Sequence, residues 1–261
     1  MKVIILCGGM GTRLREETEY KPKPMVEIGG MPILWHIMKL YAHFGYKEFV
    51  LALGYKGNVI RDFFLNYHYY NNDFTINLGM KEEIVVHSRH REHDWKVTLA
   101  ETGLNSMTGS RVKQCGRYIT EDNFMMTYGD AVSNVDIRKL VDFHLKHNLT
   151  ATVTGVFPPS RFGDLMVENE RVLAFKEKKK VVSDERIING GFFVFKKEFL
   201  DTIPDDPTCD LEKAPLENIA KTNQLAVYRH PDFWQCMDTF RDYQYLNGLW
   251  NENPLWKVWD E

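Results

Sequence analysis

The sequence lacks several features that would assign the protein to a specialised class. No apolar run approaches the roughly 20 residues of a membrane span, and the amino terminus enters a strand-like pattern at once instead of a signal peptide. The four cysteines lie far apart and form no CxxC pair, which argues against a disulfide framework and a thiolate zinc site. We therefore expect a cytoplasmic protein with reduced thiols, in which any metal ion is held by oxygen ligands.

An excess of basic residues is also missing. The formal net charge is -3 and the pI is near 6.3, so the composition does not favour nucleic-acid binding, although a small phosphorylated ligand needs only a local basic patch. No Pro/Gly/Ser linker, low-complexity tract or internal repeat divides the 261 residues. We expect one domain, residues 1–261, with neither nucleic acid nor membrane as a partner.

The chain does contain short apolar strands that alternate with amphipathic helices, the pattern of a parallel sheet covered by helices. The predicted strands of the first half are residues 2–7, 48–53 and 123–128, and its helices are 32–44, 58–70 and 136–147. After Thr150 the pattern changes to antiparallel hairpins at 150–157, 165–176 and 191–195, with short helices at 211–221 and 239–252. We predict an α/β fold with a more β-rich second half.

A glycine-rich segment, LCGGMGTRL, follows the first strand. A dinucleotide fingerprint would need glycine where Leu14 stands, and a P-loop would need glycine where Arg13 stands, so neither template fits. Glycines nevertheless let backbone N–H groups approach a phosphate chain, and a helix beginning near Thr12 would point its positive end at that chain. Arg13 would then clamp phosphate oxygens. The alternative is a tight turn with a solvated arginine.

Three further charged residues are candidates for the same chemistry. In KPKPMVEIGG, prolines flank Lys23 and are expected to keep the backbone extended, so that a stiff lysine could stabilise charge on a phosphate; the alternative is a solvated connection. Asp130 ends the strand in FMMTYGD, and Asp238 ends an apolar stretch in FWQCMDT. Two carboxylates suit a Mg²⁺ ion that also binds substrate phosphates. The alternative is that each aspartate caps the helix that follows it.

Taken together, these stretches resemble the sugar-phosphate nucleotidyltransferases. The motifs in the family's order are LCGGMGTRLREET, KPKPMVEIGGMPILWHIM, GYKG, ETGLNSMTGSR, TYGD, FPPSRFG, INGGFFV and HPDFWQCMDTFRD. The resemblance is greatest to members that transfer a cytidylyl group from CTP to glucose 1-phosphate, giving CDP-glucose and pyrophosphate. It implies a mixed, mostly parallel Rossmann-like sheet flanked by helices, a nucleotide-binding half over about 1–149 and a sugar-binding β-rich lobe over about 150–261.

The resemblance also implies a role for particular residues. It implies catalytic roles for Arg13 and Lys23, and Mg²⁺ ligands at Asp130 and Asp238. The nucleotide positions are Leu6, Gly8, Gly9, Met10, Gly11, Thr12, Arg13, Lys23, Ser106, Arg111 and Gly129. The sugar-phosphate positions are Glu177, Lys178, Asn189 and Gly190.

Departures from the family pattern concern the sugar more than the reaction. EKKK replaces the usual glutamate-lysine-proline at Lys178, and residues 209–215 diverge. No residue can be shown from spacing alone to read the amino group of cytosine, so a uridylyl- or thymidylyltransferase acting on a related sugar 1-phosphate remains as an alternative, and a non-catalytic sugar-nucleotide-sensing relative is another. Three of the six tryptophans fall in the last twelve residues, from which we expect docking on a sister subunit, hence a homo-oligomer. His87, His90 and His93 are expected in a solvated loop instead of a metal site.

Overall fold

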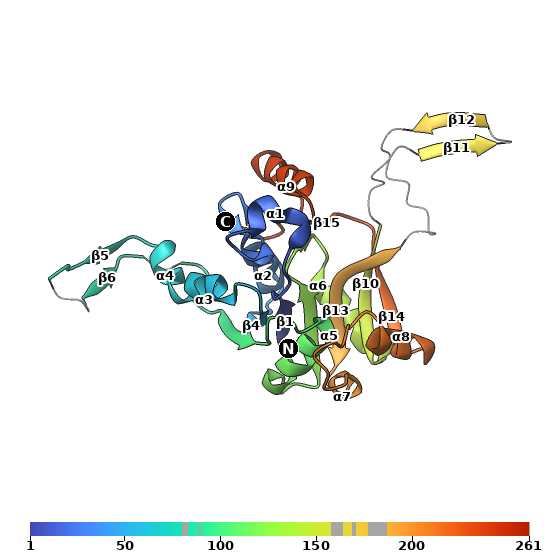
Figure 1. Cartoon of the computed structure of the whole chain (residues 1–261), viewed down its shortest axis with the longest axis horizontal. Coiled ribbons are helices and arrows are strands. Elements are labelled where there is room, and N and C mark those ends of the chain that lie inside the picture. Colours follow the sequence, from blue (N-terminus) through green and yellow to red (C-terminus); the bar gives the residue numbers. More distant parts are fainter. Residues whose placement is uncertain (80–82, 89, 158–163, 169–170, 177–186, 261) are drawn as a thin grey trace.

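A central seven-stranded sheet organises the computed structural model, which describes residues 1–79, 83–88, 90–157, 164–168, 171–176 and 187–260 (Figure 1). In spatial order its strands are β14 (Leu225–His230), β10 (Ala151–Val156), β13 (Ile188–Lys196), β8 (Asn123–Tyr128), β1 (Val3–Leu6), β4 (Glu48–Leu53) and β7 (Lys96–Glu101). The pairs from β8 to β7 are parallel, as is β10 with β14, whereas β13 runs antiparallel to both of its neighbours. The predicted mixed, mostly parallel sheet is confirmed.

Helices cover both faces of this sheet. Successive residues of β1 point to opposite faces, so that Val3 and Ile5 join one apolar core while Ile4 and Leu6 join the other. The first core is covered by α2 (Ile33–His43), α3 (Gly57–Leu65), α6 (Ile137–His147) and α9 (Phe240–Glu252), and the second by α5 (Thr108–Cys115), α7 (Phe199–Thr202) and α8 (Ala214–Lys221). Burial on both sides explains why β1 reads as one continuous apolar run.

Several predicted elements coincide with the observed ones. Strands β4 and β8 have the predicted bounds, and α6 begins directly after Asp136, whose side chain accepts a hydrogen bond from the Lys139 N–H as an N-cap. Two helices are shorter than predicted. The expected helix at 58–70 divides into α3 and α4 (Tyr67–Tyr70), and the helix expected near Thr12 is a 3₁₀ turn, Thr12–Leu14, followed by α1 (Arg15–Thr18).

The strands after Thr150 belong mostly to the central sheet. The predicted antiparallel pairing is present between β10 and β13, but β14, which was not predicted, pairs with β10 in parallel. Among the described residues of this half, β11 (Asp164–Glu168) and β12 (Arg171–Lys176) form a separate hairpin, at the upper right of Figure 1. The two halves of the chain therefore share one sheet: β14, β10 and β13 come from the second half, and β8, β1, β4 and β7 come from the first.

Three smaller pairs of strands complete the fold. They are β2 (Glu27–Ile28) with β3 (Met31–Pro32), β5 (Phe74–Ile76) with β6 (Ile84–Val86), and β9 (Ala131–Ser133) with β15 (Trp234–Cys236). In Figure 1, α4, β5 and β6 project away from the sheet as an arm. The β9–β15 pair joins segments about 100 residues apart and positions the candidate site.

The carboxy-terminal tryptophans pack inside their own chain, contrary to the prediction. Trp256 is 1% exposed and Trp259 is 8% exposed. Both rings lie against His36 of α2, which Trp250 also contacts. Trp256 and Trp259 are therefore covered by their own chain. Among the described helices, none combines the length and the apolar character needed to cross a membrane.

Candidate active site

A pocket of about 330 Å³ lies where β1 and β8 end, at the carboxyl edge of the sheet. Its lining is Leu6, Cys7, Gly8, Gly9, Gly11, Thr12, Arg13, Lys23, Pro24, Ser106, Met107, Thr108, Arg111, Tyr128, Gly129, Asp130 and Asp238. Every nucleotide and metal position predicted from the sequence is in that lining except Met10, which is 50% exposed. A larger cavity beside α4 has a mostly apolar lining without any of these residues.

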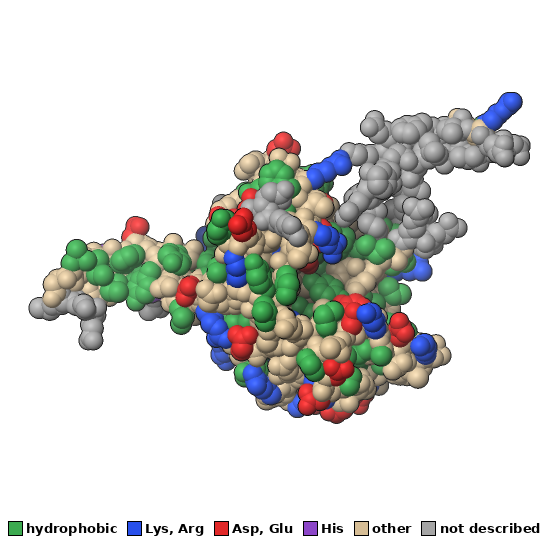
Figure 2. Space-filling view, viewed as in Figure 1, with side chains coloured by type: hydrophobic (Ala, Val, Ile, Leu, Met, Phe, Trp, Pro, Cys, Tyr) green, Lys and Arg blue, Asp and Glu red, His purple; other side chains and the backbone are tan. Residues whose placement is uncertain are grey.

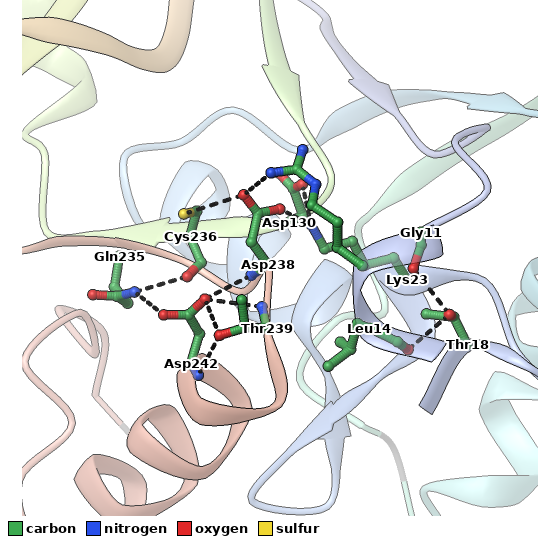
Figure 3. A network of polar contacts seen from close by, with 11 residues as sticks. Gly11, Leu14, Thr18, Lys23, Asp130, Gln235, Cys236, Asp238, Thr239 and Asp242 are labelled. Atoms are coloured by element: carbon green, nitrogen blue, oxygen red, sulfur yellow. Dashed lines mark hydrogen bonds and ion pairs between the residues drawn. The ribbon is translucent and has the colours of Figure 1, made fainter. Parts of the chain in front are cut away.

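The glycine-rich loop after β1 is held by Thr18. The hydroxyl of Thr18 donates to the carbonyl of Gly11 at 3.0 Å and to that of Leu14 at 2.8 Å (Figure 3). Gly11 has φ +62°, a left-handed conformation that glycine adopts without strain. The loop thus has a defined shape at the mouth of the pocket, with Arg13 as its outer member.

The two predicted metal ligands lie together. Asp130 follows β8, and Asp238 follows β15, which pairs with β9 directly after Asp130. The Met237 N–H also donates to the carbonyl of Asp130 at 2.8 Å. Backbone pairing between two distant segments therefore brings both carboxylates to one point, as Figure 3 shows.

Lys23 bridges the two carboxylates. Its Nζ lies 2.7 Å from Asp130 Oδ2 and 2.5 Å from Asp238 Oδ1 (Figure 3). Arg13 Nη1 lies 3.0 Å from Asp238 Oδ2. Burial by itself lowers the pKa of Lys23, but the two aspartates outweigh it and raise the pKa above its ordinary value. Lys23 therefore remains charged at neutral pH, and two cations face two anions in the pocket.

The backbone around Lys23 differs from the prediction. Pro22 is extended, with φ -70° and ψ 152°, but Lys23–Met25 forms a 3₁₀ turn. Pro24 is buried, which fixes this turn, and the Lys23 side chain is only 12% exposed. Lys21 points elsewhere and pairs with Glu27 at 3.2 Å. The expectation of an extended backbone at Lys23 is therefore wrong, and a packed turn with two ion pairs holds this side chain instead.

The alternative that the aspartates are helix caps is wrong for both. Thr239 is the N-cap of α9, and its side chain and that of Asp242 form a reciprocal capping box. Asp242 also accepts the N–H of Asp238 at 3.1 Å, which leaves the Asp238 carboxylate directed at Lys23 and Arg13. The cap of α6 is Asp136, six residues beyond Asp130.

Arg111 of α5 lines the pocket and is 4% exposed. Among the described residues its guanidinium donates only to neutral oxygens: Nη1 to Leu53 O at 2.9 Å, Thr102 Oγ1 at 2.7 Å and Gly103 O at 2.8 Å, and Nη2 to Gly8 O at 3.1 Å and Leu104 O at 3.2 Å. The sequence did not indicate these partners, because they come from the ends of three different strands.

The sugar side is only partly described. Glu177 and Lys178 lie outside the described residues. Asn189 and Gly190 begin β13, and because this strand is antiparallel to β8 they lie beyond Thr127, at the edge that carries Asp130. Asn189 Nδ2 is 3.4 Å from Tyr128 Oη, whose hydroxyl also contacts Glu212. Tyr128 and Glu212 are polar residues of this region that the sequence analysis missed.

The donor set at Asp130 and Asp238 fits Mg²⁺. Both side chains offer carboxylate oxygen, which Mg²⁺ prefers, and they stand close enough to share one ammonium group. No cluster of three or more His, Cys, Asp or Glu residues that could hold a metal occurs in the part of the chain that the structure describes. A metal bound here would therefore complete its coordination with water and substrate oxygens. His87, His90 and His93 form no such cluster either, and His90 packs against Tyr67.

Comparison with known proteins gives concordant results. A family described as Nucleotidyl transferase matches residues 2–251. Glucose-1-phosphate cytidylyltransferase from Salmonella typhi is 48% identical over 262 residues, which cover 100% of both chains. The probable glucose-1-phosphate cytidylyltransferase of Bacillus subtilis is 43% identical over 99% of this chain and 100% of its own.

Solved structures share the fold at lower identity. A putative glucose-1-phosphate thymidylyltransferase from Bacillus anthracis, in complex with a sucrose, has a TM-score of 0.70 at 18% identity and covers 97% of this chain and 96% of its own. HddC from Yersinia pseudotuberculosis has a TM-score of 0.68 at 22% identity and covers 95% and 99%. These two likenesses support the sheet topology described above.

Proposed function

Because the chain belongs to the nucleotidyl transferase family, we propose that it transfers a cytidylyl group from CTP to α-D-glucose 1-phosphate and releases pyrophosphate. The observation that carries this proposal is the 48% identity to a glucose-1-phosphate cytidylyltransferase over the full length of both chains. The pocket supports it, because three ion pairs link its charged residues in a row: Arg13 with Asp238, Asp238 with Lys23, and Lys23 with Asp130. A sensor that only binds sugar nucleotides would not need this set.

The nucleotide lies along the glycine-rich loop in this proposal. The loop amides and Arg13 take up charge on the β- and γ-phosphates, which leave together as pyrophosphate. Lys23 faces the α-phosphate, where negative charge increases during attack. A lysine held in a packed turn loses little rotamer entropy when it takes this role, and a preorganised charge of this kind stabilises a transition state strongly.

The attacking atom is a phosphate oxygen of the sugar 1-phosphate. The second pKa of a phosphate monoester is near ~6, so this oxygen is already ionised at neutral pH and no general base is required. The remaining difficulty is repulsion between two anions, which Lys23 and Arg13 reduce. Asp130 and Asp238 would hold Mg²⁺, which when bound supplies charge neutralisation at the phosphate oxygens.

The reaction is tested by measuring pyrophosphate release with CTP, UTP, dTTP and GTP against a panel of sugar 1-phosphates. We expect the largest kcat/KM for CTP with glucose 1-phosphate, and no turnover without a divalent cation. Preference for UTP or dTTP would reassign the enzyme to the uridylyl- or thymidylyltransferases. Absence of turnover with every pair, in a protein that still binds CDP-glucose by calorimetry, would favour the sensor.

Metal binding has a test that does not depend on turnover. Titration of Mn²⁺, followed by electron paramagnetic resonance in the presence of a non-hydrolysable CTP analogue, should show one bound ion. Asp238→Asn should weaken this binding by about tenfold or more, because one anionic ligand becomes neutral. Unchanged Mn²⁺ affinity in that variant would exclude Asp238 as a ligand.

We also propose that the chain forms a homo-oligomer in the cytoplasm, where CTP and sugar phosphates are made. With the tryptophan tail buried, the support comes from the arm of α4, β5 and β6. Leu65 at its base, Tyr70 and Leu78 are 73%, 69% and 88% exposed, and Figure 2 shows apolar side chains along it. A two-stranded hairpin is barely stable alone in water, so an apolar arm of this kind favours a protein partner.

Light scattering tests self-association. The wild type is expected at a multiple of the 30.6 kDa chain mass, and Leu78→Asp should shift it towards the monomer. Leu145→Asp is the matched control, since Leu145 is 54% exposed on α6, outside the arm. A monomeric wild type would end the proposal.

A further inference from the structure

Arg111 carries a buried positive charge that no carboxylate of the described residues contacts directly; Glu101, which pairs with Arg61, attracts it only from beyond ion-pair distance. Its five acceptors are four carbonyls and one hydroxyl, and it takes part in no described ion pair. Burial lowers the pKa of this guanidinium, yet an arginine stays protonated in proteins. A buried charge without a directly paired counter-charge lowers the stability of the folded protein. Because Arg111 lies beside a pocket for a polyanion, we expect a functional reason for this charge.

The acceptors belong to three loops that follow adjacent strands. Gly8 lies in the glycine-rich loop after β1, Leu53 ends β4, and the segment 102–104 follows β7. Gln114, one turn further along α5, also binds the segment after β7. Its Nε2 donates to Thr102 O at 3.1 Å and to Ser106 Oγ at 3.4 Å. One helix therefore fixes the glycine-rich loop relative to the turn that carries Ser106.

Two glycines are required by the path of this arginine. A Cβ at Gly8 would lie 2.2 Å from the guanidinium carbon of Arg111, and one at Gly54 would lie 2.5 Å from its Nη1. Neither glycine has a positive φ, so backbone conformation is not the reason for glycine at these positions. The sequence suggests that Gly8 is glycine so that backbone N–H groups can approach a phosphate. In the structure the missing side chain at Gly8 also makes room for the guanidinium of Arg111.

The pocket lies between the two loops that Arg111 joins. Gly8 to Arg13, except Met10, line one wall, and Ser106 with Met107 line another. The separation of these walls decides which nucleotide fits, because the phosphates and the base must reach their contacts at the same time. A lysine could not replace the arginine here, since an ammonium group has three donors on a compact centre, whereas the planar guanidinium reaches acceptors on three loops.

We propose that Arg111 is a positioning residue that sets the width of the nucleotide pocket and thereby the affinity and selectivity for the nucleoside triphosphate. The bound triphosphate supplies negative charge close to this guanidinium, in addition to the longer-range attraction of Glu101. The proposal rests on the proposed function in one respect: the nucleotide occupies this pocket. It adds that Arg111 acts through Gly8 and the segment 102–106.

Kinetics of Arg111→Lys and Arg111→Met test the proposal. We expect both variants to raise KM for CTP on the order of 10- to 100-fold and to reduce the preference for CTP over UTP. KM for glucose 1-phosphate should stay within about threefold of the wild type, because the sugar side lies on β13. A wild-type KM for CTP in Arg111→Lys, or equal increases in KM for both substrates, would overturn the proposal.

A variant outside the pocket lining separates positioning from direct contact. Gly54→Ala pushes on the guanidinium and should raise KM for CTP in the same way. Combined with Arg111→Met it should add less than it does alone, because the contact with the guanidinium is gone and only the contact with Gly8 O, 2.9 Å from the added Cβ, remains. Gly248→Ala on α9 is the control, since a Cβ there meets no atom within 4 Å. Full additivity of Gly54→Ala and Arg111→Met would argue that the two residues act independently, against the proposal.

Hydrogen exchange gives a readout that does not need turnover. Amides of residues 8–13 and 102–106 should exchange faster in Arg111→Lys and Gly54→Ala, while those of β13 stay as in the wild type. If the wild type used no nucleoside triphosphate, the proposed function would fail, yet this coupling of the two loops could still be observed. Unchanged exchange in both loops would refute the positioning role itself.

Discussion

Acidification should destabilise the protein through His36, the residue at the centre of the tryptophan cluster. Its Nδ1 accepts a hydrogen bond from Trp256 Nε1 at 3.4 Å, so Nε2 carries the proton and donates to the carbonyl of Ile28 at 2.8 Å. Burial lowers the pKa of His36 to about 4, although the bond to Ile28 acts in the opposite direction. A second proton on Nδ1 would face the Trp256 N–H donor.

The sign and size follow from the two pKa values. The folded state keeps His36 neutral down to about pH 4, whereas the unfolded chain takes up a proton below about pH 6.5. The unfolded state therefore binds more protons in this window, and stability falls as the pH falls through it. Between pH 7 and pH 5 the expected loss of unfolding free energy from this one residue is about 2 kcal/mol.

Urea unfolding of the wild type and His36→Gln at pH 7, 6 and 5 measures this loss. The variant is less stable at pH 7, because it disturbs a buried cluster, but its stability should fall by about 2 kcal/mol less between pH 7 and pH 5. The pKa of His144 is also lowered by burial to about 4, and its contribution remains in both proteins. His43→Gln, an exposed position on the same helix, is the control. Parallel pH profiles for His36→Gln and the wild type would refute the reasoning.

Two further predictions concern the site. Lys23→Ala should reduce kcat roughly 100- to 1000-fold with folding intact. The control is Lys21→Ala, because the Lys21 amine pairs with Glu27, and its kcat should stay within about twofold of the wild type. Similar values of kcat in the two variants would remove Lys23 from the mechanism. Thr239→Ala and Asp242→Ala should each cost about 1–2 kcal/mol in thermal or urea unfolding through loss of the capping box. Only Asp242→Ala should also weaken Mn²⁺ binding, since Asp242 holds the N–H of Asp238, and equal metal affinity in both cap variants would contradict this.

The sequence could predict those parts of the site that depend on neighbouring residues. Asp130 follows a strand whose apolar run is unmistakable, and the glycine-rich loop directly follows another, so strand ends in a parallel sheet predict that the two meet. The bounds of β4 and β8 could also be predicted to the residue, because a strand that is buried on both faces is a continuous apolar run in the sequence.

Other parts depend on pairings that no local pattern contains. Asp238 reaches Asp130 through the β9–β15 ladder, and from its own neighbourhood it reads equally well as a helix cap. The acceptors of Arg111 come from three loops, so the requirement for glycine at Gly54 is invisible without the fold. The tail was misread for the same reason: an apolar end predicts burial, but the sequence does not say whether its own chain or another one covers it.

The reversed direction of β13 has a consequence for how substrate preference can change. Because β13 starts where β10 and β8 end, the whole excursion between residues 157 and 187 leaves and rejoins the sheet at the rim that holds the reacting groups. Insertions or replacements in that excursion need not disturb any ladder hydrogen bond of the central sheet. The topology thus leaves the segment that joins β10 to β13 free to change in length while the strands of the sheet and the loops at their ends keep their places.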